Sequence, residues 1–197
     1  MKKIIFASNN AGKIKEVKEI LKDMDIELVS SKEAGISVDV EENGTTFEEN
    51  ALIKAKAIME MTGEMTMADD SGLEVDALNK EPGVYSARYL GHDTSYRIKN
   101  QAIIDRLKGV EGQDRSARFV CAMALVFPDG HNIVTTGTME GLIAEEEKGE
   151  NGFGYDPIVY IPEFGKSSAE LSPEEKNKIS HRGKALAKMK QELVKYI

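Results

Sequence analysis

The sequence predicts an α/β protein with a mixed, bent β-sheet and flanking helices that form two lobes around a central cleft. Segments with strand-like and helix-like patterns alternate along all 197 residues. Two long strand-like runs, residues 117–127 and 132–143, are joined by the turn sequence PDGH, which is typical of an antiparallel hairpin. The chain has no internal repeat and no long linker, so we expect one two-lobed domain over residues 1–197.

Two strands and a helix are expected in the first part of the chain. Residues 3–8 are the first predicted strand, because the run IIF within them is apolar and suits a buried position. Residues 12–24 are the first predicted helix, since their apolar residues recur at helical spacing. The short apolar segment 26–29 is the second predicted strand.

A second helix is predicted over residues 47–61. Two overlapping capping-box patterns precede it, Thr45 with Glu48 and Thr46 with Glu49. Either pattern places the helix start near residue 47, and the residues alone do not choose between them.

A third strand is predicted over residues 65–68, ending at the acidic pair Asp69 and Asp70. The segment 82–93 is rich in turn-forming residues and is expected to be an exposed loop. A helix is then predicted over residues 94–108.

The last part of the chain is expected to hold a strand and two helices. The strand, residues 158–161, follows a glycine-rich loop at residues 149–154. Ser172 is expected to cap a helix, with Glu175 completing a capping box. An amphipathic helix is predicted over residues 180–196.

The composition excludes several classes of function. A net charge of −8 argues against a binder of nucleic-acid polymers, because such proteins need a basic surface. The longest apolar stretch, residues 119–127, is too short to span a membrane, and the N-terminus lacks the apolar length of a signal peptide. The single cysteine, Cys121, is expected to be a buried structural thiol in a cytoplasmic protein.

The polar segment from Ser8 to Lys13 is the first candidate site. It follows a predicted strand and opens a predicted helix, so backbone N–H groups near the helix N-terminus suit an anion, and Lys13 adds a positive charge. It is not a Walker A loop, because Ala7 and Ile14 stand where that motif needs Gly and Ser or Thr. The residues alone leave open a phosphate cradle or a capped turn with a solvated lysine.

Two pairs of adjacent carboxylates are candidate metal ligands. Asp69 and Asp70 follow an apolar strand, where open α/β sheets bind ligands, and a hard cation such as Mg²⁺ prefers carboxylate oxygens. Glu41 and Glu42 lie in an acidic connector before the second predicted helix. Each pair can also be a solvated acidic turn. Adjacent residues on a strand point to opposite faces, so Asp69 and Asp70 need not share a role.

Two further segments carry candidate recognition groups. Residues 151–157 (NGFGYDP) place two aromatic rings in a glycine turn, and such rings offer a flat face to a base. The same pattern also fits a strand entry with partly buried rings. Residues 175–183 gather Lys176, His181 and Arg182 at a helix junction, where they form a donor cluster if they converge.

Together these segments resemble the Ham1-like inosine triphosphate pyrophosphatases, a family that removes non-standard purine nucleoside triphosphates. The resemblance covers essentially the whole chain, and several motifs in fixed order are far more specific than any one of them. The motifs are SNNAGK (8–13), EENGTTFEENALIKA (41–55), ADDSGLEVDAL (68–78), PGVYSARY (82–89), GFGYDPI (152–158) and EEKNKISHRGKAL (174–186).

The resemblance implies an ITPase-like two-lobed fold, usually a homodimer, and hydrolysis of ITP, dITP and XTP to the monophosphate and pyrophosphate. It implies Mg²⁺ as cofactor, with Glu42 and Asp70 as its ligands, and Asp70 as the catalytic residue that activates water to attack the α-phosphate. The substrate would be bound by Ser8, Asn9, Asn10, Ala11, Gly12, Lys13 and Lys54 at the triphosphate, by Ser71, and by Phe153, Gly154, Tyr155, Asp156, Lys176, His181 and Arg182 at the base and sugar.

Two alternative functions stay open. One is a Maf-type pyrophosphatase of other nucleotides, although the SHRG and GFGYDP segments favour the inosine-type family. The other is a non-catalytic nucleotide-binding module whose carboxylates are purely structural. The sequence does not separate the roles of Asp69 and Asp70, or those of Glu41 and Glu42.

Overall fold

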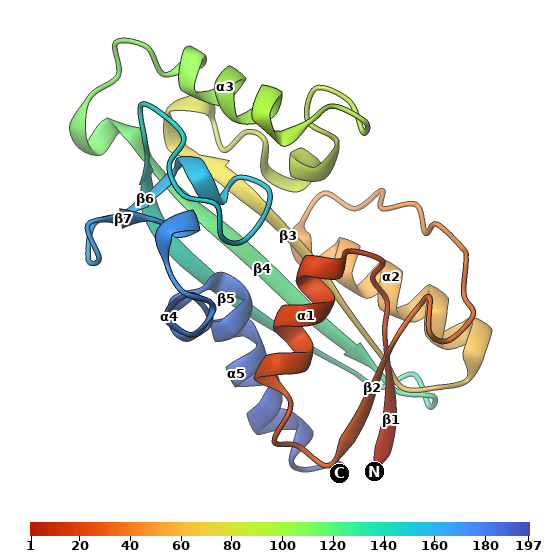
Figure 1. The fold of residues 1–197 in the computed structure, drawn as a ribbon. Coiled ribbons are helices and arrows are strands. Elements are labelled where there is room, and N and C mark those ends of the chain that lie inside the picture. The colour runs from red at the N-terminus through yellow and green to blue at the C-terminus, as the bar shows by residue number, and fades with distance from the viewer. The chain divides into compact units, whose positions relative to one another are not determined.

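The protein, described over residues 1–197 by a computed structural model, has a seven-stranded mixed β-sheet (Figure 1). The strand order is β2-β1-β3-β4-β5-β6-β7. β1 pairs in parallel with β2 and β3, whereas β6 pairs antiparallel with β5 and β7. The strands are β1 (Lys2–Phe6), β2 (Ile26–Ser30), β3 (Thr66–Val75), β4 (Ser116–Val126), β5 (Asn132–Ile143), β6 (Val159–Ile161) and β7 (Lys166–Ser167). The predicted α/β class with a mixed sheet is confirmed.

Five α-helices and five short 3₁₀ helices accompany the sheet. The α-helices are α1 (Ala11–Ile20), α2 (Phe47–Thr62), α3 (Tyr96–Arg106), α4 (Pro173–Ile179) and α5 (His181–Leu193). The 3₁₀ helices are η1 (Asp76–Leu78), η2 (Gly83–Arg88), η3 (Gly112–Arg115), η4 (Asp156–Ile158) and η5 (Ser168–Glu170). None of the helices combines the length and the apolar character that a membrane crossing requires.

The chain divides into two compact units. Unit 1 comprises Met1–Asp70, Cys121–Gly137 and His181–Ile197, and unit 2 comprises Ser71–Val120 and Thr138–Ser180. The expected cleft between two lobes stays a prediction.

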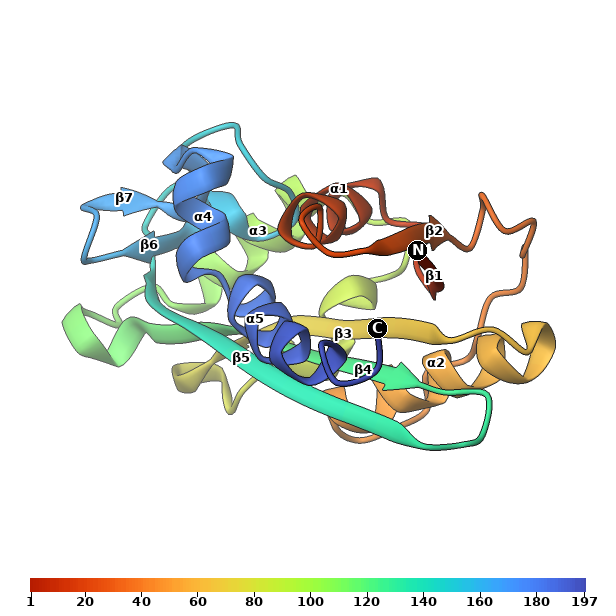
Figure 2. The ribbon, with the colours of Figure 1, turned by 90° about the horizontal axis from the view of Figure 1, so that it is seen from below.

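Unit 1 has its own apolar core, built from strands whose two faces are both covered. Ile4 and Phe6 on one face of β1 pack in a cluster with Val17 of α1 and Met189 of α5. Figure 2 shows α2 on the opposite face of the strands of this unit from α1 and α5. Strands covered on both faces read as continuous apolar runs, which explains why IIF at residues 4–6 is apolar throughout.

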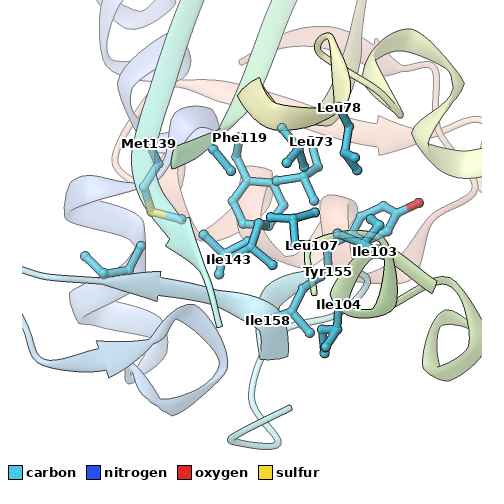
Figure 3. Packing of buried hydrophobic residues seen from close by; sticks show 14 of the residues in the cluster. Leu73, Leu78, Ile103, Ile104, Leu107, Phe119, Met139, Ile143, Tyr155 and Ile158 are labelled. Atoms are coloured by element: carbon cyan, nitrogen blue, oxygen red, sulfur yellow. The ribbon is translucent and has the colours of Figure 1, made fainter. Parts of the chain in front are cut away.

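Unit 2 has a second apolar core (Figure 3). Leu73 of β3, Phe119 of β4 and Ile143 of β5 pack there against Ile103 of α3. Tyr155, from the glycine-rich loop, also points into this cluster. The loop is therefore attached to the core of unit 2 by one of its own side chains.

The helix starts follow the predicted capping chemistry. Asn10 caps α1, and its side chain accepts a hydrogen bond from the backbone N–H of Lys13. Of the two overlapping capping boxes before α2, the protein uses Thr46 with Glu49. Ser172 and its capping box begin α4 as expected.

The expected end of the third strand is wrong. β3 does not stop before Asp69 but continues through both aspartates to Val75. It lies between β1 and β4 in the sheet order, and both carboxylates are buried. Asp69 Oδ2 pairs with Lys13 and Arg182, and Asp70 Oδ2 accepts from Asn50. The segment expected as a plain loop at 82–93 contains η2, and β7 was not predicted.

Candidate active site

The loop between β1 and α1 is held by two local hydrogen bonds. Asn10 donates its backbone N–H to Ser8 Oγ over 3.2 Å, and its Oδ1 accepts from the N–H of Lys13 over 3.1 Å. These two bonds hold the turn in place before the first helical residue, Ala11. The N-terminus of α1 then presents its positive end at the surface, which favours a bound anion.

Asp69 lies at the centre of a buried charge network in unit 1. Its Oδ2 is 3.0 Å from Lys13 Nζ and 3.4 Å from an Arg182 terminal nitrogen. The other terminal nitrogen of Arg182 donates to Glu16. Burial alone would lower the pKa of Arg182, but Asp69, Cys121 and Glu16 outweigh burial and raise it. Asp69 therefore holds two cationic side chains in place, one of them in the first turn of α1.

Asp70 lies in a different environment from its neighbour. Asn50 of α2 donates its Nδ2 to Asp70 Oδ2 over 3.1 Å, while Asn50 Oδ1 accepts from the backbone N–H of Gly44 over 2.8 Å. Burial, followed by repulsion from Glu42, raises the pKa of Asp70 to about 6, although Lys54, Lys13 and Asn50 act in the opposite direction. The carboxylate is thus costly to ionise and is a stronger proton acceptor than an ordinary aspartate.

Lys54 connects the acidic connector to the carboxylates of β3. Its Nζ donates to Glu42 Oε1 over 2.6 Å. Burial would lower the pKa of Lys54, but Asp69, Glu42 and Asp70 together outweigh burial and raise it. Lys54 therefore stays protonated. Of the two connector glutamates, Glu42 is half-buried at this lysine while Glu41 is exposed.

Glu42 and Asp70 suit a hard cation shared with a phosphate ligand. They are close enough for their mutual repulsion to raise the pKa of Asp70, and a divalent cation would relieve that repulsion. No group of three or more His, Cys, Asp or Glu side chains forms a closed metal cage in the protein. Mg²⁺ commonly binds through one or two carboxylates together with water and substrate phosphates, so this pair fits it.

In unit 2, Asp156 organises the glycine-rich loop. Its Oδ2 accepts from the backbone N–H of Phe153 over 2.9 Å and from Lys176 Nζ over 2.7 Å, and its Oδ1 accepts from Ser168 Oγ over 2.8 Å. A side chain at Gly152 would lie 2.2 Å from Asp156 Oδ2, and the backbone there has φ +73°, so only glycine fits.

The two aromatic rings of this loop are placed differently. Phe153 is half-buried, and Lys176 Nζ lies 5.2 Å from the centre of its ring. Tyr155 is buried in the core of unit 2, where its hydroxyl donates to the Ser86 carbonyl over 2.7 Å. The expectation that both rings offer a face to a base is therefore wrong for Tyr155 and stays a prediction for Phe153.

The expected donor cluster is distributed over the two units. Lys176 belongs to unit 2 and is paired with Asp156. His181 and Arg182 open α5 in unit 1, where both are buried. Ser71 follows Asp70 on β3, at the first position of unit 2.

Sequence reasoning missed two residues of unit 1. Asn50 lies four positions before Lys54, and Glu16 lies three positions after Lys13, so each shares a helix face with a predicted lysine. This spacing is the signal that points to both residues. Each holds a predicted site residue in place, Asn50 at Asp70 and Glu16 at Arg182.

The model of the Ham1 family matches residues 4–192, which is nearly the whole chain. The chain belongs to the Ham1 family. The resemblance carried by the six sequence motifs is thereby confirmed.

Named relatives of this Ham1 chain share one description. A protein of Clostridium perfringens (strain 13 / Type A), named dITP/XTP pyrophosphatase, is 50% identical over 199 residues, covering 98% of each chain. A protein of Bacillus subtilis (strain 168) with the same name is 47% identical over 189 residues, covering 96% of each chain.

Solved Ham1 structures have the same fold. The structure of a HAM1 protein from Coxiella burnetii matches with a TM-score of 0.90 at 43% identity, covering 99% of this chain and 100% of that one. The Staphylococcus aureus Ham1 protein matches with a TM-score of 0.88 at 44% identity, covering 100% of both chains.

Proposed function

We propose that this Ham1-family chain hydrolyses ITP, dITP and XTP to the nucleoside monophosphate and pyrophosphate, cleansing the nucleotide pool. The observation that carries the proposal is the arrangement of unit 1, where Lys13, in the first turn of α1, pairs with the buried Asp69, and Lys54 pairs with the half-buried Glu42. Near full-length similarity to proteins named dITP/XTP pyrophosphatase supports the substrate class.

The triphosphate is assigned to residues 8–13 and to Lys54. A triphosphate is repelled by a protein of net charge −8 unless local cations neutralise it. The helix N-terminus at Ala11 attracts phosphate oxygens, and the ion pairs of Lys13 and Lys54 hold both ammonium groups in place before the ligand binds.

Asp70 is assigned to the attacking water. The water adds to the α-phosphorus and its proton passes to the Asp70 carboxylate. The bond from the α-phosphorus to the bridging oxygen breaks, and Lys13 and Lys54 stabilise the charge on the leaving pyrophosphate. Bound Mg²⁺, which we assign to Glu42 and Asp70, supplies further neutralisation of phosphate charge.

Asp69 is assigned a positioning role instead of a metal-binding one. Its Oδ2 is already shared by Lys13 and Arg182, so its charge is balanced without a metal. Glu41 is exposed and is assigned no role at the metal.

The base and sugar are assigned to the loop carrying Phe153 and to the donors Lys176, His181 and Arg182. Hypoxanthine and xanthine carry an oxygen acceptor at position 6, where adenine carries an amino donor. Opposite adenine, such donors would find no acceptor at position 6 of the base, and each mismatched buried polar group costs about 1–3 kcal/mol. We therefore infer a preference for ITP and XTP over ATP of roughly 10²-fold or more.

A homodimer and a cytoplasmic location complete the proposal and rest on family membership alone. Sedimentation of the purified protein tests the first: a single species of twice the chain mass is the expected result.

Pyrophosphate release from a panel of nucleoside triphosphates tests the proposed reaction. With Mg²⁺ present we expect release from ITP, dITP and XTP, little from ATP, and none in excess chelator. Release from dTTP or UTP but not from ITP would instead indicate a Maf-type enzyme. Tight ITP binding without any release would indicate a non-catalytic binding module.

A further inference from the structure

Asn100 of α3 is buried beneath the glycine-rich loop of unit 2. It is 1% exposed, and it shares a helix face with Tyr96 and Ile103, which lie four positions before and three positions after it. Ile103 packs in the core of unit 2 together with Tyr155 of the loop (Figure 3). The polar side chain of Asn100 therefore sits in a mostly apolar helix face.

The Asn100 amide bridges two acceptors on different segments. Its Nδ2 donates to Glu147 Oε1 over 2.8 Å and to the Gly154 carbonyl over 3.2 Å. The Glu147 carboxylate oxygen and the Gly154 carbonyl oxygen are both acceptors. The Asn100 amide must therefore turn its NH₂ group, and not its oxygen, toward them. Asn100 Oδ1 is then left buried without a hydrogen-bond partner.

The glycine-rich loop is thereby held on two sides of Phe153. On one side Asp156 accepts from the Phe153 N–H. On the other, Asn100 binds the Gly154 carbonyl, and the Tyr96 ring lies edge-on to Tyr155 at 5.2 Å between centres. Gly154 has φ +66°, a conformation that favours glycine, so its carbonyl direction is specific to this turn.

We propose that Asn100 is a positioning residue for base recognition, acting by bridging Glu147 and the Gly154 carbonyl so that Phe153 is fixed. This inference rests on the proposed assignment of Phe153 and Lys176 to the base. A buried amide with an unsatisfied oxygen costs free energy that an apolar residue at the same place would not. The hydrogen bonds that Asn100 donates to Glu147 and to the Gly154 carbonyl explain why an amide occupies this position.

Steady-state kinetics of Asn100→Ala test the proposal. We expect the KM for ITP to rise about tenfold, with kcat changed less than about threefold, because uniform binding of the base is weakened and not the chemistry. The inhibition constant of pyrophosphate, which lacks a base, should stay unchanged. The matched control is Gln101→Ala, which removes an exposed amide from the next position of α3.

A pair of isosteric variants keeps the test independent of folding losses. Asn100→Asp places a carboxylate against Glu147 and the Gly154 carbonyl and should raise the KM further than Asn100→Ala. Adding Glu147→Gln to Asn100→Asp restores one donor between the two side chains, so the KM should fall part of the way back. Because KM does not depend on how much enzyme is folded, partial unfolding lowers only the apparent kcat.

Three results would overturn the role of Asn100: an unchanged KM in Asn100→Ala, equal changes in the ITP and pyrophosphate constants, or no recovery in the double variant. Phe153→Ala and Lys176→Met distinguish this failure from that of the base site. If those two variants raise the KM for ITP and Asn100→Ala does not, only the role of Asn100 is wrong. If Phe153→Ala and Lys176→Met also leave the KM for ITP unchanged, the assignment of Phe153 and Lys176 to the base is itself wrong.

Discussion

Asp69 and Asp70 are neighbours on one strand, yet their surroundings give them different chemistry. The charge of Asp69 is balanced by Lys13 and Arg182, so its carboxylate is already engaged. Asp70 has a neutral amide partner in Asn50 and a like charge in Glu42, which leaves it poised between its protonated and ionised forms. The alternation of side chains along β3 is what separates the two environments.

We expect Asp70→Asn to lower kcat for ITP by roughly 10²- to 10⁴-fold, because the amide cannot accept the proton from water or carry the charge that a metal needs. Nucleotide binding, measured by equilibrium titration, should be largely kept. Asp69→Asn is the companion variant, and it should act mainly through KM because it releases Lys13. Near wild-type turnover of Asp70→Asn would show that another group accepts the proton.

Asp70→Asn should also stabilise the protein in the absence of divalent metal. The folded pKa of Asp70, about 6, lies above its ordinary value, so the folded state loses stability as the pH rises from about 4 to about 6. Above about pH 6 the full cost of ionising Asp70 in the folded state remains. Asp70→Asn removes this cost and should raise the free energy of unfolding by an amount on the order of 1–3 kcal/mol at pH 7.

Chemical denaturation of both proteins in chelator, at pH 7 and at pH 4, measures this difference. The gain in the free energy of unfolding should be present at pH 7 and should be much smaller at pH 4, where Asp70 is protonated in the folded state and about half protonated in the unfolded state. A gain of equal size at both pH values would show that the carboxylate charge is not its cause.

At the scale of elements, the contact between α5 and β5 sets the position of the Arg182 helix. A Cβ at Gly137 would lie 2.3 Å from the His181 carbonyl oxygen and 2.7 Å from the Ala185 nitrogen. Thr135 Oγ1 donates to the Ala185 carbonyl over 2.8 Å on the same strand face. The first turn of α5 therefore touches the β5 backbone directly.

Gly137→Ala should displace this first turn and move Arg182 away from Asp69. Overpacking of this kind costs about 1–3 kcal/mol, which corresponds to a fall in Tm of roughly 2–10 °C. The kcat for ITP should fall about tenfold or more because a small displacement of a site helix is enough to disturb catalysis.

The control is Thr136→Ala, which lies on the other face of β5 and should change neither quantity much. If Gly137→Ala lowers Tm but leaves kcat intact, the packing of α5 matters for stability and not for the active site.

At the scale of the whole molecule, acid stability should depend on Asp76, a carboxylate of unit 2 to which no catalytic role is assigned. Asp76 accepts from Arg118 over 2.9 and 3.1 Å, from Lys80, and from Ser116 over 2.6 Å. The hydrogen bond from Arg118, followed by those from Lys80 and Ser116, lowers the pKa of Asp76 well below its usual range. A lowered pKa means that the stabilisation is complete above about pH 4 and is lost as the pH falls further.

Asp76→Asn should therefore be less stable than the wild type at pH 7, and the two should converge as the pH is lowered toward 2. Urea denaturation at several pH values gives both curves. A difference that does not shrink in acid would mean that Asp76 acts through packing and not through its charge.

Much of the fold was predictable because local signals determine it. Capping residues such as Asn10, Thr46 and Ser172 mark helix starts through hydrogen bonds to nearby N–H groups. The end of β3 was not predictable, because Asp69 and Asp70 are acceptable inside a strand only when residues distant in sequence, such as Arg182 and Asn50, satisfy them. Nearby sequence cannot reveal such partners.

The same distinction applies to the candidate site. Motif order pointed to Lys13, Lys54 and Asp70, and both lysines lie close enough to Asp70 to lower its pKa against the effect of burial. The other features of the site depend on tertiary packing. Tyr155 packs into the core of unit 2, and Asp69 and Asp70 differ because Asp69 pairs with Lys13 whereas Asp70 accepts from Asn50.

The three-part construction of unit 1 has a consequence for protein synthesis. Its α5, which supplies Arg182 to Asp69, is translated after all of unit 2, whereas Lys13 and Asp69 leave the ribosome much earlier. During that interval the nascent chain carries Asp69 without its buried guanidinium partner and the apolar face of β1 without Met189. Unit 2, whose residues are all translated by Ser180, has no such delay. Unit 1 can therefore be completed only after its last helix, α5, has been made.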